Sequence, residues 1–571
     1  MKQARQQAEG MFLRSAVEKI LSDRDIKKKE NLQLKKSCEN VLEELKAEST
    51  DGHNSVILPD KERIIEADRY FLPFELACRS KSPKIVITAL DCLQKLIAYG
   101  HLTGRGADSS NPDRKLIDRI VEAICSSFIG QGTDEAAILA VVLTNNCEVH
   151  EGSLLLAVRT CFTIFLATKS PINQSTAKGT LTQVINAVFA NMERVGSERD
   201  DATIISDVME YLVTSAVLLL SESSDDADVR NQLIGSSSTI WGELDGNQQD
   251  DHVSFPNVEH KDAFLIFRSL CVLAQKEEGD LNDPRQGFLP KRYNYMSFEV
   301  DHSSNTHLNS KMLALEMLLL ILQNASTALQ NAQPFILLIK RSLCVALSRN
   351  AVSSNVKVFE KSLAIFVQLL DKFKIHLKLQ IEVFFKEIII SMLESSSCSF
   401  EHKWIVLHTI GKILANPQSV VDLYVNYDCD LTAYNVFENL VDVVSKTART
   451  ERAMRLLGLR CLTDLLQCLV DWFDVCETAK ENLLPCRSED DEMILEIPTS
   501  PTVNKFMHLK QKKELMEHGI MLFSRKPKQG LAFLQEHGFV GTEPREIAEF
   551  LMKEDRLDKT VVGDFLGNPD E

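Results

Sequence analysis

Apolar residues recur three and four residues apart along nearly the whole of this 571-residue chain, which is the period of an α-helix. No stretch shows the sustained alternation of a half-buried strand, and glycine and proline number only 23 and 16. Repeated helix pairs with short connections, without a sequence repeat of fixed length, predict an all-α fold. The architecture we expect is an α-solenoid of HEAT- or armadillo-like helix pairs.

Two changes of composition divide the predicted helices into three blocks. An acidic, serine-rich stretch at 221–260 separates 1–220 from 261–474, and a second acidic stretch at 475–503 precedes 504–571. Within the first block the period predicts helices over about 3–48 (two helices), 82–100, 115–128, 133–144, 152–168, 175–192 and 201–220. The middle block is interrupted by a polar segment, 278–309, which we interpret as an inserted loop.

A polar turn lies inside the most apolar block of the chain. Asn416-Pro417 predicts a helix start, with Asn as the cap and Pro in the first turn, and that helix should run to about Tyr424. A second helix is predicted to begin after Asp430, whose carboxylate would accept the free N–H groups of its first turn. Between them lies Asn426-Tyr427-Asp428-Cys429-Asp430, whose short polar side chains can satisfy backbone donors that burial would leave unpaired.

Composition excludes several classes of function. A net charge of −17 argues against nucleic acid as a partner and against membrane binding by overall charge. The fourteen cysteines show no zinc spacing and sit in apolar contexts, which predicts buried free thiols in a reducing compartment. No signal peptide, membrane span, phosphate loop, HExxH or GxSxG motif is present, so we assign no catalytic residue, metal or cofactor.

The polar turn resembles the box that names the HUS region (homology upstream of the Sec-seven domain) of large Arf guanine-nucleotide exchange factors. Similar agreement with the brefeldin-A-inhibited subfamily is found in Ile381-Glu-Val-Phe-Phe-Lys-Glu-Ile388 and Ser399-Phe-Glu-His-Lys-Trp404. It is also found in Ala67-Asp-Arg-Tyr-Phe-Leu-Pro-Phe-Glu-Leu-Ala-Cys78 and Asp91-Cys-Leu-Gln-Lys-Leu-Ile-Ala-Tyr-Gly-His-Leu-Thr-Gly104. The resemblance covers most of the chain.

This resemblance assigns a region to each block. Residues 1–220 correspond to the DCB (dimerisation and cyclophilin-binding) region and 261–474 to the HUS region. Residues 504–571 resemble the opening helices of the all-α Arf-exchange catalytic domain, on the segments Gly541-Thr-Glu-Pro-Arg-Glu-Ile-Ala-Glu-Phe-Leu551 and Val562-Gly-Asp-Phe-Leu-Gly567. The family's exchange loop, Phe-Arg-Leu-Pro-Gly-Glu, does not occur in the sequence, so we expect this chain to be inactive in exchange on its own.

By resemblance, the function expected is regulation and scaffolding of Arf exchange in Golgi and endosomal vesicle traffic. It would act through DCB–HUS interaction, dimerisation, autoinhibition and GTPase-dependent recruitment to membranes. The expected partners are Arf and Arf-like small GTPases, a second copy through the DCB region, and the peripheral surface of trans-Golgi and endosomal membranes from the cytoplasm. For the GTPase contact we predict Tyr70, Phe71, Lys95, Tyr99 and His101, because aromatics beside a lysine and a glycine-rich exit have the composition of an interface.

Alternatives stay open at three points. Asp428 and Asp430 either cap the helix expected at Leu431 or reach across to the DCB region. The chain as a whole could instead be a generic helical-repeat adaptor, or a competent exchange factor with a C-terminal continuation. Leu462-Thr-Asp-Leu-Leu466 matches an LxxLL partner motif, although such leucines on a helix belong far more often to the core.

Overall fold

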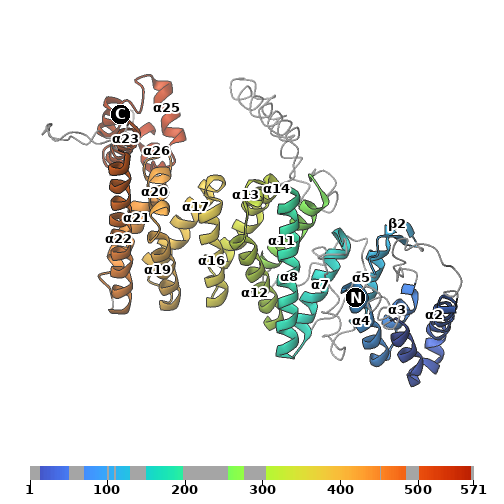
Figure 1. Ribbon diagram of the computed structural model, residues 1–571. Helices are drawn as coiled ribbons and strands as arrows, with labels where there is room; N and C mark the ends of the chain where they lie inside the picture. Colours follow the sequence, from blue (N-terminus) through green and yellow to red (C-terminus); the bar gives the residue numbers. More distant parts are fainter. Residues whose placement is uncertain are drawn as a thin grey trace. The chain divides into compact units, whose positions relative to one another are not determined.

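The computed structural model of the chain describes residues 13–50, 70–98, 102–108, 111–128, 149–196, 255–275, 304–450, 452–483 and 501–567. These residues belong to two compact units, Met1–Ala346 and Leu347–Glu571 (Figure 1). The division falls inside the predicted HUS region. Each unit has its own helical packing.

Unit 1 opens with a helix over 13–22, followed by short 3₁₀ turns and a series of longer helices. Its elements are η1 (Arg24–Lys27), η2 (Lys29–Asn31), α2 (Leu32–Thr50), α3 (Phe71–Cys78), α4 (Pro83–Ala98), β1 (Ala107–Asp108), β2 (Asn111–Lys115), α5 (Leu116–Ser126), α7 (Glu151–Ala167), α8 (Pro171–Gly196), α11 (Val258–Gln275), α12 (Ser304–Gln323), α13 (Thr327–Asn331), α14 (Gln333–Leu338) and the π-helical turn η9 (Ile339–Leu343). Helix α15 (Cys344–Asn350) spans the division between the units.

The core of unit 1 continues from the predicted DCB region into the predicted HUS region. Helices α7 and α8 pack against each other, and α11 packs on both of them and on α12. Phe335 lies at the centre of this packing, with ring centroids 5.7 Å from both Phe264 and Phe267 and 6.4 Å from Phe189. Edge-to-face aromatic contacts of this kind stabilise a core beyond the burial of their area.

Unit 2 contains α16 (Val356–Lys372), η10 (Lys374–His376), α17 (Lys378–Val383), η11 (Phe384–Ile390), α18 (Ser391–Glu394), α19 (Phe400–Leu414), α20 (Pro417–Leu423), η12 (Tyr424–Asp428), α21 (Val436–Thr447), α22 (Arg452–Leu483), α23 (Pro501–Arg525), α24 (Pro527–Glu536), α25 (Pro544–Lys553) and α26 (Lys559–Gly567). Of the η elements, η11 and η12 are π-helical turns. In Figure 1 the orange α19 to α22 lie side by side, and α23 to α26 gather at the C-terminal end.

The last four helices have a core of their own. Ile520, Phe523, Leu551 and Leu557 form a buried cluster. Helices α23 and α24 approach closely at Gly530, where an added Cβ would lie 2.3 Å from the Phe523 backbone. Gly538 ends this helix pair in the left-handed conformation, at φ 72°.

The predicted all-α helical-repeat class is confirmed in both units, since helices stacked on their neighbours make up nearly all of the described residues. One expectation about strands was incomplete. Residues Ala107–Asp108 and Asn111–Lys115 pair as a short antiparallel hairpin, which is too brief to show an alternating pattern.

Several predicted boundaries differ from the structure. Helix α12 already begins at Ser304, inside the predicted 278–309 loop, and α22 runs to Leu483, inside the predicted 475–503 linker. Glu543 caps α25, because it forms a capping box with Glu546. The predicted helices at 133–144 and 201–220 lie outside the described residues.

Among the described residues no helix is long and apolar enough to cross a membrane. The eleven described cysteines are all free, and nine of them are buried. Burial raises the pKa of several of these thiols, to about 12 at Cys78 and Cys92. The predicted buried thiols are therefore confirmed in the part of the chain that the structure describes.

Candidate functional site

The polar turn of unit 2 is entered through a capped helix, as the sequence predicted. The Asn416 side chain accepts hydrogen bonds from the backbone N–H groups of Gln418 and Ser419, at 3.0 and 3.4 Å. Helix α20 then passes directly into the π-helical turn η12, which contains the first three residues of the predicted box. Such π turns widen a helix locally and are frequent at functional sites.

Tyr427 anchors this turn in the core. Its side chain is buried, and its hydroxyl donates a 3.1 Å hydrogen bond to the Lys378 carbonyl on α17. Burial raises the pKa of the Tyr427 hydroxyl, and Glu382 nearby acts in the same direction. The phenol therefore stays protonated and serves as a donor at every physiological pH.

Asp428 is the cap of helix α21. Its side chain is 0% exposed, and its two carboxylate oxygens accept the backbone N–H groups of Phe437 and Glu438, at 2.9 and 3.0 Å. Burial raises the pKa of Asp428, while the two backbone donors and the nearby lysines 510 and 513 oppose that rise. The expectation that Asp430 would cap a helix beginning at Leu431 was wrong. Residues 431–435 form an irregular turn, so α21 starts at Val436.

Asp430 has a different task in the same turn. It accepts hydrogen bonds from the Thr432 backbone and hydroxyl, at 2.9 and 2.8 Å, and forms a 2.5 Å ion pair with Lys378. Partial burial alone would raise the pKa of Asp430, but the bonds from Lys378 and Thr432 lower it to about 2. Asp430 thus closes the 431–433 turn and ties it to α17.

The remaining two residues of the predicted box act locally. The Asn426 amide donates to the Asp422 carbonyl at 2.9 Å, one turn earlier. Cys429 is buried, its backbone N–H donates to the Tyr424 carbonyl at 3.1 Å, and burial raises the pKa of its thiol. A thiol in that state is a small core residue and not a nucleophile.

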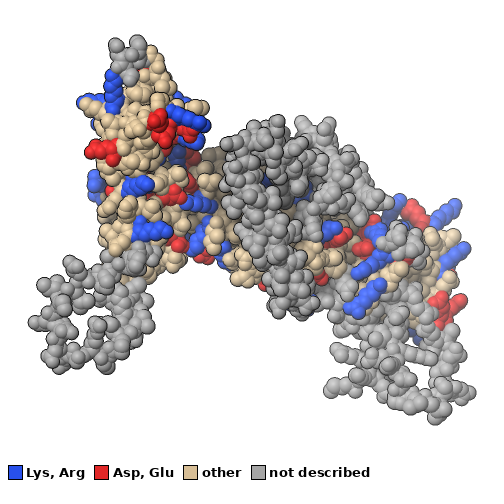
Figure 2. Space-filling view, turned by 90° about the horizontal axis from the view of Figure 1, so that it is seen from above, with Lys and Arg blue, Asp and Glu red and all other residues tan. Residues whose placement is uncertain are grey.

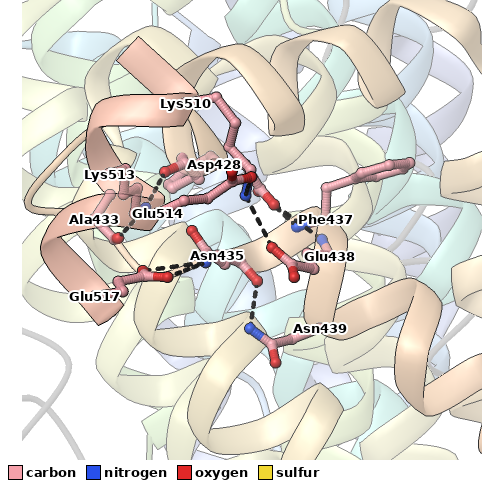
Figure 3. A network of polar contacts seen from close by, with 11 residues as sticks. Asp428, Ala433, Asn435, Phe437, Glu438, Asn439, Lys510, Lys513, Glu514 and Glu517 are labelled. Atoms are coloured by element: carbon pink, nitrogen blue, oxygen red, sulfur yellow. Dashed lines mark hydrogen bonds and ion pairs between the residues drawn. The ribbon is translucent and has the colours of Figure 1, made fainter. Parts of the chain in front are cut away.

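A buried lysine from α23 completes the site. Lys513 is 0% exposed, and its ammonium donates to the Tyr427 carbonyl at 2.8 Å and to the Ala433 carbonyl at 2.6 Å (Figure 3). The first carbonyl lies within the box, and the second lies three residues after it. Burial lowers the pKa of Lys513, against the attraction of Glu517 and Asp428. The lysine therefore holds the turn closed and fixes α23 upon it.

Two further contacts join α23 to the start of α21. Lys510 forms a 2.8 Å ion pair with Glu438, and the Asn435 amide donates to both carboxylate oxygens of Glu517, at 3.1 and 3.2 Å (Figure 3). Burial by itself would lower the pKa of Lys510, but Glu438 and the Asp428 carboxylate raise it overall. Together with Lys513, these residues form what we call the box–α23 junction: Asp428, Asn435, Glu438, Lys510, Lys513 and Glu517.

Of the five residues predicted to contact a GTPase, two are buried, one lies on the surface and two lie outside the described residues. Tyr70 and Phe71 are 1% and 3% exposed, so they are core residues and not a surface. Phe71 lies beneath the Arg119 guanidinium, 5.9 Å from its ring centroid. Lys95 is on the surface of α4, where it pairs with Asp91 at 2.8 Å. Tyr99 and His101 lie outside the described residues.

The contact between the predicted DCB and HUS regions is made elsewhere, in unit 1. Asp262 on α11 is 3% exposed, and its carboxylate accepts the Glu151 backbone N–H at 2.6 Å and pairs with His150 at 2.7 Å. It therefore caps α7 from a different region of the chain. Lys178 on α8 and Glu316 on α12 add a 2.6 Å ion pair across the same packing. Nothing in the sequence around Asp262 distinguished it from a surface carboxylate.

The surface charges do not suggest a charged ligand. On the face seen in Figure 2, basic and acidic side chains of the described residues lie next to one another along both units. Many charged side chains of the described residues belong to helix-surface pairs, for example Lys95–Asp91 and Lys446–Asp442. Pairs of this kind are solvated and contribute little to stability.

Fold and site define a class: an all-α helical-repeat protein in which a buried polar turn holds the first of four C-terminal helices that share a core of their own. Family comparisons agree with this description. The DCB (dimerisation and cyclophilin-binding) domain of Mon2/Sec7/BIG1-like proteins matches residues 12–198, and their HUS domain matches residues 259–436. The Sec7 domain matches residues 512–571. The chain belongs to this Mon2/Sec7/BIG1-like family.

Curated relatives support the same assignment. The chain is 36% identical to brefeldin A-inhibited guanine nucleotide-exchange protein 1 from Homo sapiens, in an alignment covering 98% of this chain and 40% of the relative. It is 28% identical to brefeldin A-inhibited guanine nucleotide-exchange protein 2 from Arabidopsis thaliana, covering 97% of this chain and 37% of the relative. The chain thus spans about two fifths of the length of these relatives.

Among solved structures, Kap121p is similar at 11% sequence identity and a TM-score of 0.20, over 98% of this chain and 58% of that chain. A score at that level carries no argument about fold or function. The fold assignment rests on the helices themselves and on the family matches.

Proposed function

We propose that this chain is the regulatory and scaffolding N-terminal part of an Arf guanine-nucleotide exchange factor that acts in Golgi and endosomal vesicle traffic. The family assignment supports it, because the DCB and HUS matches cover most of the chain and the Sec7 match follows them. The names of the curated relatives describe guanine nucleotide-exchange proteins. We assign no catalytic residue, metal or cofactor to the described residues.

One observation carries the mechanistic part of the proposal. Lys513 is the second residue of the Sec7 match. It is wholly buried, and its ammonium donates hydrogen bonds to the carbonyls of Tyr427 and Ala433. The HUS box therefore holds the helix that enters the exchange domain. A change in the box–α23 junction would alter how that helix is presented, which is a physical route from the regulatory region to the exchange domain.

The proposed partners follow from the same assignment. Arf and Arf-like GTPases are the expected targets, and the DCB region is the expected site of self-association, in keeping with the description of that domain. We further propose a cytoplasmic protein that GTPases recruit to the peripheral surface of trans-Golgi and endosomal membranes. Flotation of the chain with liposomes, with and without a membrane-anchored Arf loaded with GTP, tests this recruitment.

The coupling can be tested in a chimera in which residues 1–571 replace the matching part of the human relative. Lys513→Met should accelerate nucleotide exchange on Arf about fivefold or more, because coupled sites are typically linked by at least 1 kcal/mol. Lys505→Met, an exposed lysine on the same helix, is the matched control. An unchanged rate in Lys513→Met, with α23 nevertheless loosened in amide exchange, would reduce the junction to a structural role.

A generic helical-repeat adaptor is the competing function. It predicts no effect of any junction variant on exchange and no GTP-dependent flotation. An unchanged exchange rate by itself would restrict the junction to a structural role. Unchanged exchange in every junction variant together with no GTP-dependent flotation would count against the exchange-factor proposal.

A further inference from the structure

Helix α22 has two apolar faces, and only one of them is packed. The packed face consists of Met454, Gly458, Cys461, Leu465 and Cys468, all buried. It lies against α19 and α21, where an added Cβ at Gly458 would come within 3.0 Å of the Ala448 backbone. The leucines of the LxxLL match therefore divide: Leu465 belongs to this core, while Leu466 does not.

The second face is an exposed stripe along the other side of α22. Leu456, Leu459, Leu466, Val470 and Phe473 are 72%, 48%, 64%, 54% and 57% exposed. With Thr463 they form the heptad series 456, 459, 463, 466, 470, 473, which is the seam of a two-helix coiled coil. A helix that is apolar on both sides is normally covered on both sides. We call this set the α22 stripe.

The charges beside the stripe are arranged for a second copy in the opposite direction. Arg452, Arg455 and Arg460 lie in the first third of α22, and Asp471 and Asp474 lie beyond its middle. Arginines in the first turn are also repelled by the positive end of the helix dipole. A parallel copy of α22 would place Arg455 of one helix beside Arg460 of the other, whereas an antiparallel copy sets the arginine-bearing end of one helix level with the end that carries Asp471 and Asp474 of the other.

The spacing of the stripe fits the same arrangement. When Leu456 lies opposite Phe473 of a second copy, Leu459 falls opposite Val470 and Thr463 opposite Leu466. Large side chains thus meet smaller ones in the outer layers, and the sequence is complementary to itself, as an interface with two-fold symmetry requires.

We propose that the α22 stripe is a self-association surface, on which the α22 helix of a second copy of this chain lies antiparallel. The surface is separate from the DCB domain, which the family description associates with dimerisation. It therefore adds a second contact between copies and does not depend on the exchange-factor proposal. In this arrangement Leu466 of the LxxLL match packs against Thr463 of the second copy.

Cysteine cross-linking of the full chain tests both the contact and its direction. Gln467→Cys lies beside the two-fold axis, so a short bismaleimide should link the two copies there. Arg452→Cys is the matched control, because its two copies would lie about 37 Å apart in the antiparallel register at 1.5 Å per residue. The nearby native cysteines should react slowly, since burial raises the pKa of Cys461 and Cys468.

The expected result is a covalent dimer from Gln467→Cys and none from Arg452→Cys. Adding Leu466→Glu and Val470→Glu should reduce the cross-linked fraction more than about tenfold, because each would bury an unpaired carboxylate. Ile375→Glu, at another exposed apolar position of unit 2, should leave the fraction unchanged. A dimer in solution without the Gln467 cross-link, or a cross-link at Arg452, would overturn the proposal.

Discussion

Two buried aspartates cap helices in this chain, one in each unit, and they do so at very different sequence distances. Asp428 accepts N–H groups only nine and ten residues away. Asp262 accepts the N–H of Glu151, 111 residues earlier. Both carboxylates remove orphan donors from a helix start. One is part of a local turn, whereas the other joins two regions of the chain.

Their countercharges differ as well. Asp428 has lysines nearby, Lys510 and the wholly buried Lys513, both from α23. Asp262 pairs with His150, whose pKa is raised by the hydrogen bond to that carboxylate. No histidine lies among the residues of the box–α23 junction, whereas the α7–α11 contact includes one, and histidine is the side chain whose ordinary pKa lies in the physiological range. The comparison indicates that the second contact is the more sensitive to pH.

The largest effect is expected from Lys513→Met. The substitution removes the ammonium donor from two carbonyls, those of Tyr427 and Ala433, and the Tyr427 carbonyl keeps only a 3.3 Å hydrogen bond from the Asp430 N–H. We expect a loss of about 2–4 kcal/mol in the free energy of opening α21 and α23, because two hydrogen bonds from a charged donor are lost. Hydrogen–deuterium exchange of peptides from these helices measures it. Lys505→Met should change by less than about 0.5 kcal/mol, and a similar result for Lys513→Met would contradict the assignment.

A smaller effect is expected from Asp428→Ala. Two N–H groups of α21 lose their acceptor, but the buried carboxylate, whose pKa burial has raised, is removed as well. We expect a loss of about 1–3 kcal/mol, confined to the start of α21. Asp442→Ala on the exposed face of the same helix is the control. Equal amide exchange in both variants would show that Asp428 does not act as the cap.

The caps Asn416 and Asp428 show how much of this site the sequence could predict. Asn416 was predicted because a cap followed by proline is a local signal. Asp428 was predicted as a cap only together with Asp430 and for a helix at Leu431, because the irregular turn at 431–435 lies between the aspartate and its helix. Helix periodicity does not measure the length of such a turn. The all-α class followed from the apolar period, while the 107–115 hairpin was too short to leave a pattern.

Lys513 was missed although a signal for it existed. The sequence presented a lysine-rich helix, and nothing in composition separates one lysine from another. Its position does: Lys513 falls in the apolar series of α23 with Met516, Ile520 and Phe523. A lysine in an apolar stripe predicts burial on backbone acceptors. The Asp262–His150 contact left no such signal, because it depends on how α7 and α11 pack.

The α7–α11 contact should be weaker at higher pH. A raised folded-state pKa means that His150 contributes stability below its ordinary pKa of 6.5, and that this contribution is lost as the pH rises through the folded value. Asp262 and Glu259 face the imidazole and favour its charge, while Lys115 opposes it. We expect His150→Gln to destabilise the start of α7 by about 1 kcal/mol at pH 6 and by less at pH 8. Amide exchange at the two pH values measures it, and an equal loss at both would contradict the ion pair.

The smallest effect is expected from Asp430→Ala, the box residue that the sequence favoured as the cap. Its ion pair with Lys378 is partly exposed, with side-chain accessibilities of 31% and 43%, so we expect a loss of about 0.5–1 kcal/mol at neutral pH. Because the folded-state pKa is lowered to about 2, that contribution is present above its ordinary value of 3.8 and is lost as the pH falls through about 2.

Asp430→Ala also separates the two contacts compared above. Its partners are Lys378 and Thr432, so amide exchange should rise in the 431–435 turn and stay unchanged in α7 and α11. Asp422→Ala, which removes another carboxylate paired to a lysine of the same region, serves as the control for a lost ion pair outside the turn. If exchange in α7 and α11 rose with Asp430→Ala alone, the box would act on the DCB–HUS contact after all. The division into a local junction and a separate, pH-sensitive contact would then fail.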